Sequence, residues 1–121
     1  KSEINLLMVH LIAPIGSTFT KLKGDALEIL NNEANKVDGK VIVMGDFNTT
    51  PYSPQISSLR NSSKFYSASK GKGLLDTWEG PSFLKFQIDH AFLSNNMKVD
   101  RFEVKGTEGS DHHMIYLEVK Y

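Results

Sequence analysis

The stretch that decides the fold of this chain is Val41-Ile42-Val43-Met44-Gly45-Asp46-Phe47-Asn48-Thr49-Thr50-Pro51. Its first four residues are apolar and mostly β-branched, which is typical of a short strand buried on both faces. The apolar run stops at Gly45, and an acid and an amide follow two positions apart. Because residues i and i+2 of an extended chain point to the same side, Asp46 and Asn48 should project together from the carboxyl end of a central strand. Open α/β sheets bind their ligands at such strand ends.

The Asp46 and Asn48 side chains allow two interpretations. A carboxylate can hold a metal or take a proton from water, and an amide can donate a hydrogen bond to a phosphate oxygen without adding charge. Asp and Asn also bond to their own backbone in tight turns, so Gly-Asp-x-Asn after a strand is equally ordinary turn chemistry. The tetrapeptide alone leaves both interpretations open.

The composition indicates one soluble domain. The chain has 121 residues, of which 40% are hydrophobic and 23% charged, as in globular proteins with a hydrophobic core. The formal net charge is zero, so bulk electrostatics do not favour a nucleic-acid surface or an anionic membrane. The absence of cysteine excludes disulfides and thiolate sites. No apolar run reaches membrane-spanning length, and the chain opens directly in a strand, so we expect an excised piece of a longer protein.

The first forty-odd residues predict a strand, a helix and a second strand. Residues 4–12 are almost continuously apolar, which suits an interior strand. Between residues 20 and 37 apolar residues recur at helical spacing, and the polar residues, Lys23 among them, cover the rest of the helix. The expected core face consists of Leu22, Ala26, Ile29, Leu30, Ala34 and Val37. A right-handed crossover then makes the strands at 4–12 and 40–44 parallel, and places His10 and Asp46 at the same edge of the sheet.

The remainder of the chain predicts further strands joined by loops. Ser53-Pro54 suits the start of a short helix that ends near Arg60, and residues 61–70, rich in serine and lysine, indicate a surface loop. Residues 86–94 predict a strand with Asp89 in its middle, where a buried carboxylate needs a partner. Residues 99–105 and 114–119 predict an outer and a final strand.

Acids and imidazoles gather at the ends of these strands or in the adjoining loops. Buried carboxylate–imidazole pairs hold an imidazole charged and oriented. With four histidines in the whole chain, this convergence is hard to explain as packing. The clusters are His10, Asp46 with Asn48, Asp89 with His90, and Asp111 with His112 and His113.

Four of these segments together resemble, in order and in approximate spacing, the motifs of the endonuclease/exonuclease/phosphatase superfamily, which has the DNase I-like fold. They are His10 to Pro14, Gly45-Asp46-Phe47-Asn48, Ile88-Asp89-His90 and Ser110-Asp111-His112. The resemblance implies that residues 1–121 form a single partial domain, the carboxyl-terminal half of a four-layer α/β sandwich with a mixed sheet and flanking helices. It also implies a metal-dependent phosphoesterase that hydrolyses a phosphodiester or phosphomonoester.

The resemblance further implies a role for each polar residue that follows the central strand. Asp46 would orient or deprotonate the attacking water, and Asn48 would hold a phosphate oxygen. Asp111 would help to bind a divalent metal, with Asp46 and Asn48 as further candidate ligands. Oxygen ligands suit Mg²⁺ or Mn²⁺ better than zinc.

The histidines receive different roles. His112, paired with Asp89, would contact the scissile phosphate and stabilise the negative charge that phosphoester cleavage builds on oxygen. His10 matches the family position whose imidazole assists near the phosphate and the leaving group. We interpret His90 and His113, which fall outside the shared motifs, as structural.

This sequence departs from the family in one large respect. The amino-terminal half of the family's domain supplies an Asn and a metal-binding Glu, and no matching residues occur here. We therefore expect an incomplete metal site, one sheet face left open, and little or no activity from the isolated chain. Either the missing half or a second copy of the chain would be its partner. The alternative is a non-catalytic half-domain that acts as a binding or dimerisation module.

The substrate and the location of the protein are less well defined. The substrate would be a phosphate ester of a nucleic acid, a nucleotide or a lipid headgroup, since all of these are cleaved on this fold. The segments Thr50-Pro51-Tyr52-Ser53 and Gly71-x-Gly73 resemble uncharacterised bacterial members, some of which carry membrane helices upstream. A soluble domain of a membrane-anchored bacterial parent is the corresponding expectation.

Overall fold

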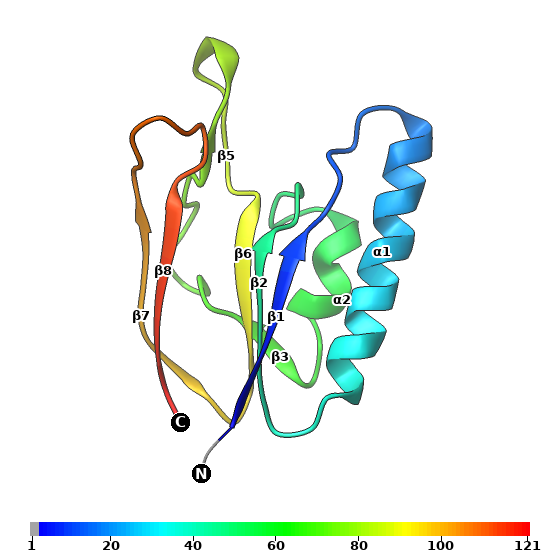
Figure 1. Ribbon diagram of the computed structural model, residues 1–121, viewed down its shortest axis with the longest axis vertical. Coiled ribbons are helices and arrows are strands. Elements are labelled where there is room, and N and C mark those ends of the chain that lie inside the picture. The colour runs from blue at the N-terminus through cyan, green and yellow to red at the C-terminus, as the bar shows by residue number, and fades with distance from the viewer. Residues whose placement is uncertain (1–2) are drawn as a thin grey trace.

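The centre of the molecule is a mixed four-stranded sheet with the order β1-β2-β6-β3. The computed structural model describes residues 3–121 (Figure 1). Strands β1 (Ile4–His10) and β2 (Lys40–Asp46) are parallel and are joined by helix α1 (Ser17–Lys36), which confirms the predicted crossover. Strand β6 (Asp89–Ser94) pairs antiparallel with both β2 and β3 (Phe65–Ser67).

The two faces of the sheet are covered by different structures (Figure 1). Helix α1 packs on one face together with the short helices η1 (Pro54–Ile56) and α2 (Ser57–Arg60). The antiparallel ribbon of β7 (Lys98–Lys105) and β8 (Met114–Lys120) packs on the other. Successive residues of β2 therefore enter two different cores, and this explains its unbroken apolar sequence. None of the helices in residues 3–121 combines the length and apolarity needed to cross a membrane.

Strand β1 lies at an edge of the sheet and not in its interior, contrary to the sequence-based prediction. Leu7 and Val9 pack on the helix-side core, whereas the alternate residues Leu6 and Met8 are exposed, Met8 to 70%. The β7–β8 ribbon covers the opposite face over β2 and β6. An unbroken apolar run thus correctly indicated a strand with two apolar faces. The open sheet face expected from the missing half of the domain is confined to β1, because the β7–β8 ribbon covers the rest of that face.

The buried face of α1 also differs from the prediction. Leu27 and Ala34 are buried and Leu30 packs beside them, but Leu22 is 51% exposed. Lys23, predicted to face solvent, is buried instead. The helix carries two apolar stripes about a quarter-turn apart, so periodicity alone could not choose between them.

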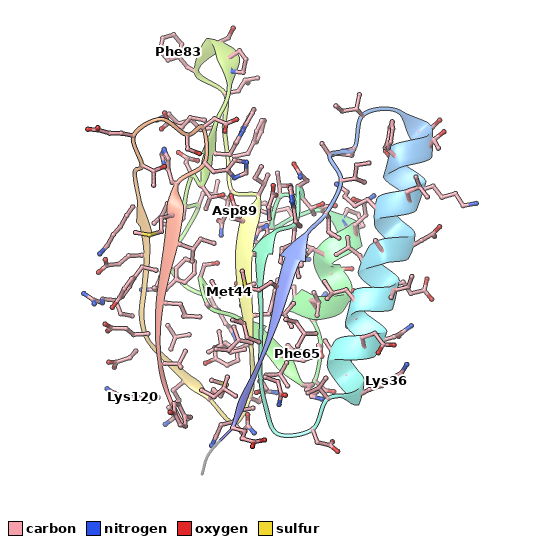
Figure 2. The ribbon with its side chains drawn as sticks, in the orientation of Figure 1. Lys36, Met44, Phe65, Phe83, Asp89 and Lys120 are labelled. Atoms are coloured by element: carbon pink, nitrogen blue, oxygen red, sulfur yellow. The ribbon has the colours of Figure 1, made fainter. Side chains whose placement is uncertain are left out.

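The region from residue 61 to residue 70 is not a loop throughout, as its polar composition had suggested. Phe65 begins β3, pairs with β6 and is buried on the helix side of the sheet (Figure 2). Three residues are too few to produce an alternating pattern. The short helix predicted after Ser53-Pro54 is present, and the Ser53 hydroxyl accepts the backbone N–H of Gln55 at its start.

A two-stranded hairpin projects beyond the end of the main sheet. Strands β4 (Trp78–Glu79) and β5 (Lys85–Phe86) flank the turn η2 (Pro81–Phe83), and Figure 2 shows Phe83 at its tip. The predicted strand over 86–94 is therefore divided between β5 and β6. As a result Asp89 is the first residue of β6, at the end of the sheet, and not the middle of a strand.

Candidate active site

Gly45 brings the two parallel strands together where the candidate site begins. A Cβ atom on Gly45 would lie 2.0 Å from the backbone oxygen of Val9, and its φ of +142° is one that other residues rarely adopt. The close approach sets His10 of β1 opposite Asp46 of β2. Glycine is therefore required immediately before the acid for steric reasons.

Asp46 and Asn48 form both the predicted turn and the predicted pair of projecting side chains. The Asp46 Oδ1 atom accepts the Asn48 backbone N–H at 2.7 Å, and Asn48 Nδ2 donates to Asp46 Oδ2 at 3.2 Å. Asn48 Nδ2 also donates to the Leu11 carbonyl at 2.6 Å. Asn48 has a φ of 47°, a left-handed conformation that asparagine tolerates better than most residues. The two interpretations of the sequence are thus compatible.

The environment of Asp46 favours its neutral form. Burial raises the pKa of the Asp46 carboxyl, the N–H of Asn48 lowers it, and the adjacent charge of Asp89 raises it again. His112 and His10 lower it by smaller amounts, and the net pKa is raised. A carboxylate with a raised pKa is better suited to accept a proton near neutral pH, as a general base must.

Asp89 and His112 make the closest acid–imidazole contact of the site. His112 Nδ1 lies 2.9 Å from Asp89 Oδ2, and His112 Nε2 lies 3.8 Å from Asp46 Oδ2. Burial lowers the pKa of His112, but the hydrogen bond to Asp89 and the surrounding carboxylate charges outweigh it, so the net pKa is raised. One ligand atom from each of these three residues lies within 4.8 Å of the others.

Backbone pairing fixes this arrangement. Asp46 and Asp89 are directly opposite each other in the β2–β6 pair, and His112 bridges to Trp78 of β4. The buried Thr77 hydroxyl accepts the backbone N–H groups of Ile88 and Asp89, each at 3.0 Å. Thr77 thus holds the strand end that presents Asp89.

His10 and Asp111 lie at the margin of the cluster. His10 Nε2 is 3.9 Å from Asp46 Oδ2, and its side chain is 85% exposed. Asp111 Oδ2 accepts the indole N–H of Trp78 at 2.8 Å and does not belong to the group within 4.8 Å. An open pocket of about 470 Å³ adjoins Asn48, with Trp78 and Phe86 in its wall.

The other two histidines lie elsewhere. His90 is buried, its Nε2 lies 2.6 Å from the Thr49 carbonyl oxygen, and its ring packs edge-on against Phe47. Burial lowers the pKa of His90. His113 Nε2 lies 3.7 Å from a Glu79 carboxylate oxygen.

Sequence reasoning missed Lys23 and Thr77 at this site. Both are polar side chains that are fully or almost fully buried, and each holds the backbone of a segment that carries a site residue. No local pattern marks such residues, because their partners lie far away in the chain. In α1 the only signal is Lys23 among apolar neighbours, at helical spacing from Leu27 and Ala34.

Solved structures with the same fold span about twice the length of this chain. A humanized D. rerio TDP2 superimposes with a TM-score of 0.78 at 18% identity, over 98% of this chain and 55% of that one. The human Nocturnin catalytic domain with bound sulfate superimposes with a TM-score of 0.68 at 21% identity, over 93% of this chain and 45% of that one. The Bacteroides thetaiotaomicron mannosyl-6-phosphatase Bt3783 superimposes with a TM-score of 0.63 at 17% identity, over 96% of this chain and 51% of that one.

The family assignment comes from the sequence and agrees with these folds. No curated protein matches the chain. The model of the Endonuclease/Exonuclease/phosphatase family matches residues 5–112, which include every one of the motifs identified in the sequence. The architecture is about half of the DNase I-like fold, as predicted. The chain belongs to the Endonuclease/Exonuclease/phosphatase family.

Proposed function

We propose that this chain is the phosphate-handling half of a divalent-metal-dependent phosphoesterase. The observation that carries the proposal is the meeting of Asp46, Asp89 and His112, from three separate segments, at one end of the sheet. Figure 2 shows Asp89 at this end, between the main sheet and the β7–β8 ribbon. A packing role does not require three ionisable groups so close together.

The donor atoms present fit a hard cation. Two carboxylates provide oxygen ligands, and Mg²⁺ and Mn²⁺ prefer oxygen. Asp46 would hold the ion with Asn48, while Asp89 stays paired with His112; Asp111 would serve as a further ligand once released from the Trp78 indole. When bound, the ion would neutralise charge on the phosphate oxygens. This charge stabilisation is what phosphoester hydrolysis needs from a metal.

The side chains of the cluster support a division of roles. Asp46 would take the proton of the attacking water, to which its raised pKa is suited. The amide of Asn48 would donate to a phosphate oxygen in place of its 3.2 Å hydrogen bond to Asp46, and His112, whose charged form Asp89 favours, would stabilise the negative charge of the transition state. Exposed His10 is free to assist at the leaving group.

The substrate is a phosphate ester of a nucleic acid, a nucleotide or a lipid headgroup. Solved structures with this fold are named for different phosphate compounds: one D. rerio TDP2 structure contains a single-strand DNA product, and the Bacteroides thetaiotaomicron protein is named as a mannosyl-6-phosphatase. The partner that completes the site is the other half of the domain or a second copy of the chain. A soluble domain of a membrane-anchored bacterial parent is consistent with this proposal.

Hydrolysis of bis-p-nitrophenyl phosphate by the full-length parent tests the function. Turnover should require Mg²⁺ or Mn²⁺, stop on addition of EDTA, and disappear in Asp46→Asn with the circular dichroism spectrum unchanged. Full activity in Asp46→Asn would refute the role given to this carboxylate. The isolated 121-residue chain should show little or no turnover.

A second candidate function is that of a non-catalytic binding or dimerisation module. It is favoured by Asp111, which is engaged by Trp78 and lies outside the cluster, and by the exposed edge strand that carries Met8. Calorimetric titration of the 121-residue chain with Mg²⁺, together with its mass by light scattering, separates the two functions. A dimer without metal binding supports the module, and a monomer with Mg²⁺-dependent turnover excludes it.

A further inference from the structure

Lys23 is the one lysine among the largest fully buried side chains in the described part of this chain. It lies in the second turn of α1 and is 2% exposed. Lysines are almost never buried to this extent unless they are paired. Its Nζ atom donates to the backbone carbonyl of Asn48 at 2.8 Å, across 25 positions of sequence. The partner of this buried cation is therefore the loop that carries the candidate phosphate ligand.

The Asn48 peptide needs such a partner. Its φ of 47° lies in the left-handed region, which costs free energy for any residue with a Cβ atom. Asp46 accepts the Asn48 N–H on one side, and Lys23 donates to the Asn48 carbonyl on the other. The backbone N–H and the backbone carbonyl of Asn48 are thus both hydrogen-bonded, and the direction of its side chain is fixed with them.

The charge of Lys23 also acts on the site. Burial lowers the pKa of Lys23, while the charge of nearby Asp46 acts in the opposite direction. The candidate site holds the carboxylates of Asp46 and Asp89 close together, which by themselves would repel a phosphate. A cation beneath Asn48 reduces this repulsion without occupying the space that a substrate needs.

We infer that Lys23 is a positioning residue of the phosphate site, which holds Asn48 in its left-handed conformation through the hydrogen bond to its carbonyl and offsets the negative charge of Asp46. The expectation that Lys23 raises the affinity for phosphate rests on the proposed function. The hydrogen bond by which Lys23 holds Asn48 does not depend on it. A purely structural lysine would only fill space beneath the loop with its aliphatic stem.

Three substitutions of Lys23 distinguish the two roles in the 121-residue chain. Lys23→Met keeps the stem and removes both donor and charge, Lys23→Gln keeps a neutral donor, and Lys23→Arg keeps the charge. Lys21→Met is the matched control, because Lys21 is exposed on the same helix. The first readout is the ¹H–¹⁵N signals of the Asn48 backbone and side-chain amides. The second is the affinity for inorganic phosphate from chemical-shift titration.

The positioning role predicts displaced or broadened Asn48 signals and phosphate affinity lower by about tenfold in Lys23→Met, the factor typical of a hydrogen bond to a charged group. Lys23→Gln should lose an intermediate amount, Lys23→Arg should recover most of the affinity, and Lys21→Met should match the unsubstituted chain. If Lys23→Met does not fold, Lys23→Gln takes its place in the comparison.

Two results would overturn the inference. One is unchanged Asn48 signals and phosphate affinity in Lys23→Met or Lys23→Gln. The other is an equal loss in all three substitutions, including Lys23→Arg, in proportion to a fall in thermal stability, which would indicate packing alone. If the unsubstituted chain and its full-length parent both fail to bind phosphate, the proposed function fails, and the Asn48 signals still decide whether Lys23 holds the loop.

Discussion

Replacement of Asp89 by Asn should destabilise the chain more at acidic than at alkaline pH. The pKa of His112 is raised in the folded state, mainly by its 2.9 Å hydrogen bond to Asp89 and the charge of that carboxylate against the opposing effect of burial. A raised histidine pKa contributes stability that is complete below the unfolded value of 6.5 and is lost as the pH rises through the folded value. Asp89→Asn removes most of this contribution.

The size of the destabilisation by Asp89→Asn depends on how exposed the Asp89–His112 pair is to solvent. A hydrogen bond to a charged group contributes about 1.5–3 kcal/mol. The His112 side chain is 35% exposed, so solvent screening reduces the charged part of the contribution to about 1 kcal/mol. We therefore expect the destabilisation by Asp89→Asn to be larger at pH 5.5 than at pH 8.5 by about 1 kcal/mol.

Urea unfolding followed by circular dichroism at the two pH values measures this difference. Asp25→Asn, at an exposed acid of α1, is the control and should show no comparable dependence on pH. In parallel, the His112 ring resonances should titrate at lower pH in Asp89→Asn than in the unsubstituted chain. An equal loss of stability at both pH values, with an unchanged His112 titration, would refute the charged Asp89–His112 pair.

Three further predictions concern the residues around this pair. Asp46→Asn should raise the free energy of unfolding at pH 7 by roughly 0.5–1 kcal/mol while it abolishes metal-dependent hydrolysis, because burial and Asp89 disfavour the charged carboxylate; urea unfolding and activity measure the two effects. Gly45→Ala should lower the free energy of unfolding by about 3 kcal/mol or more, because the added Cβ would meet the Val9 backbone. Gly24→Ala, in open space on α1, should raise it by about 1 kcal/mol, and thermal melts compare the two variants. His90→Gln should reduce the loss of stability on acidification below pH 6.5, because burial lowers the pKa of His90 in the folded chain and that stability is lost as the pH falls; unfolding at pH 5 and 7.5 tests this.

The parts of the fold that were predicted from sequence are those with strong local patterns. The apolar run before Gly45, the helical spacing of α1 and the intervening crossover follow from periodicity and handedness, and the structure confirms each. The position of β1 at the edge of the sheet and the pairing of β3 with Phe65 were not predicted. Both features depend on which elements pair with or cover a strand, and these cannot be predicted from the residues of the strand itself.

The candidate site was predicted unevenly for a similar reason. Asp46, Asp89 and His112 each lie next to a strand end, so topology alone brought them to one edge. Lys23 and Thr77 support the same site from the interior, where a polar residue is visible only through a distant partner. Polar residues that cluster at the end of a sheet can thus be found from strand ends, whereas the buried residues that hydrogen-bond to their backbone require the structure.

The most direct test of the central claim is the line broadening caused by Mn²⁺ in the ¹H–¹⁵N spectrum of the 121-residue chain. Substoichiometric Mn²⁺ should broaden the signals of Asp46, Asp89 and His112 first, and Asp46→Asn should greatly reduce the effect. Broadening centred on other acids, such as Glu28 and Glu33 of α1, or equal loss of all signals, would contradict a metal site at this end of the sheet.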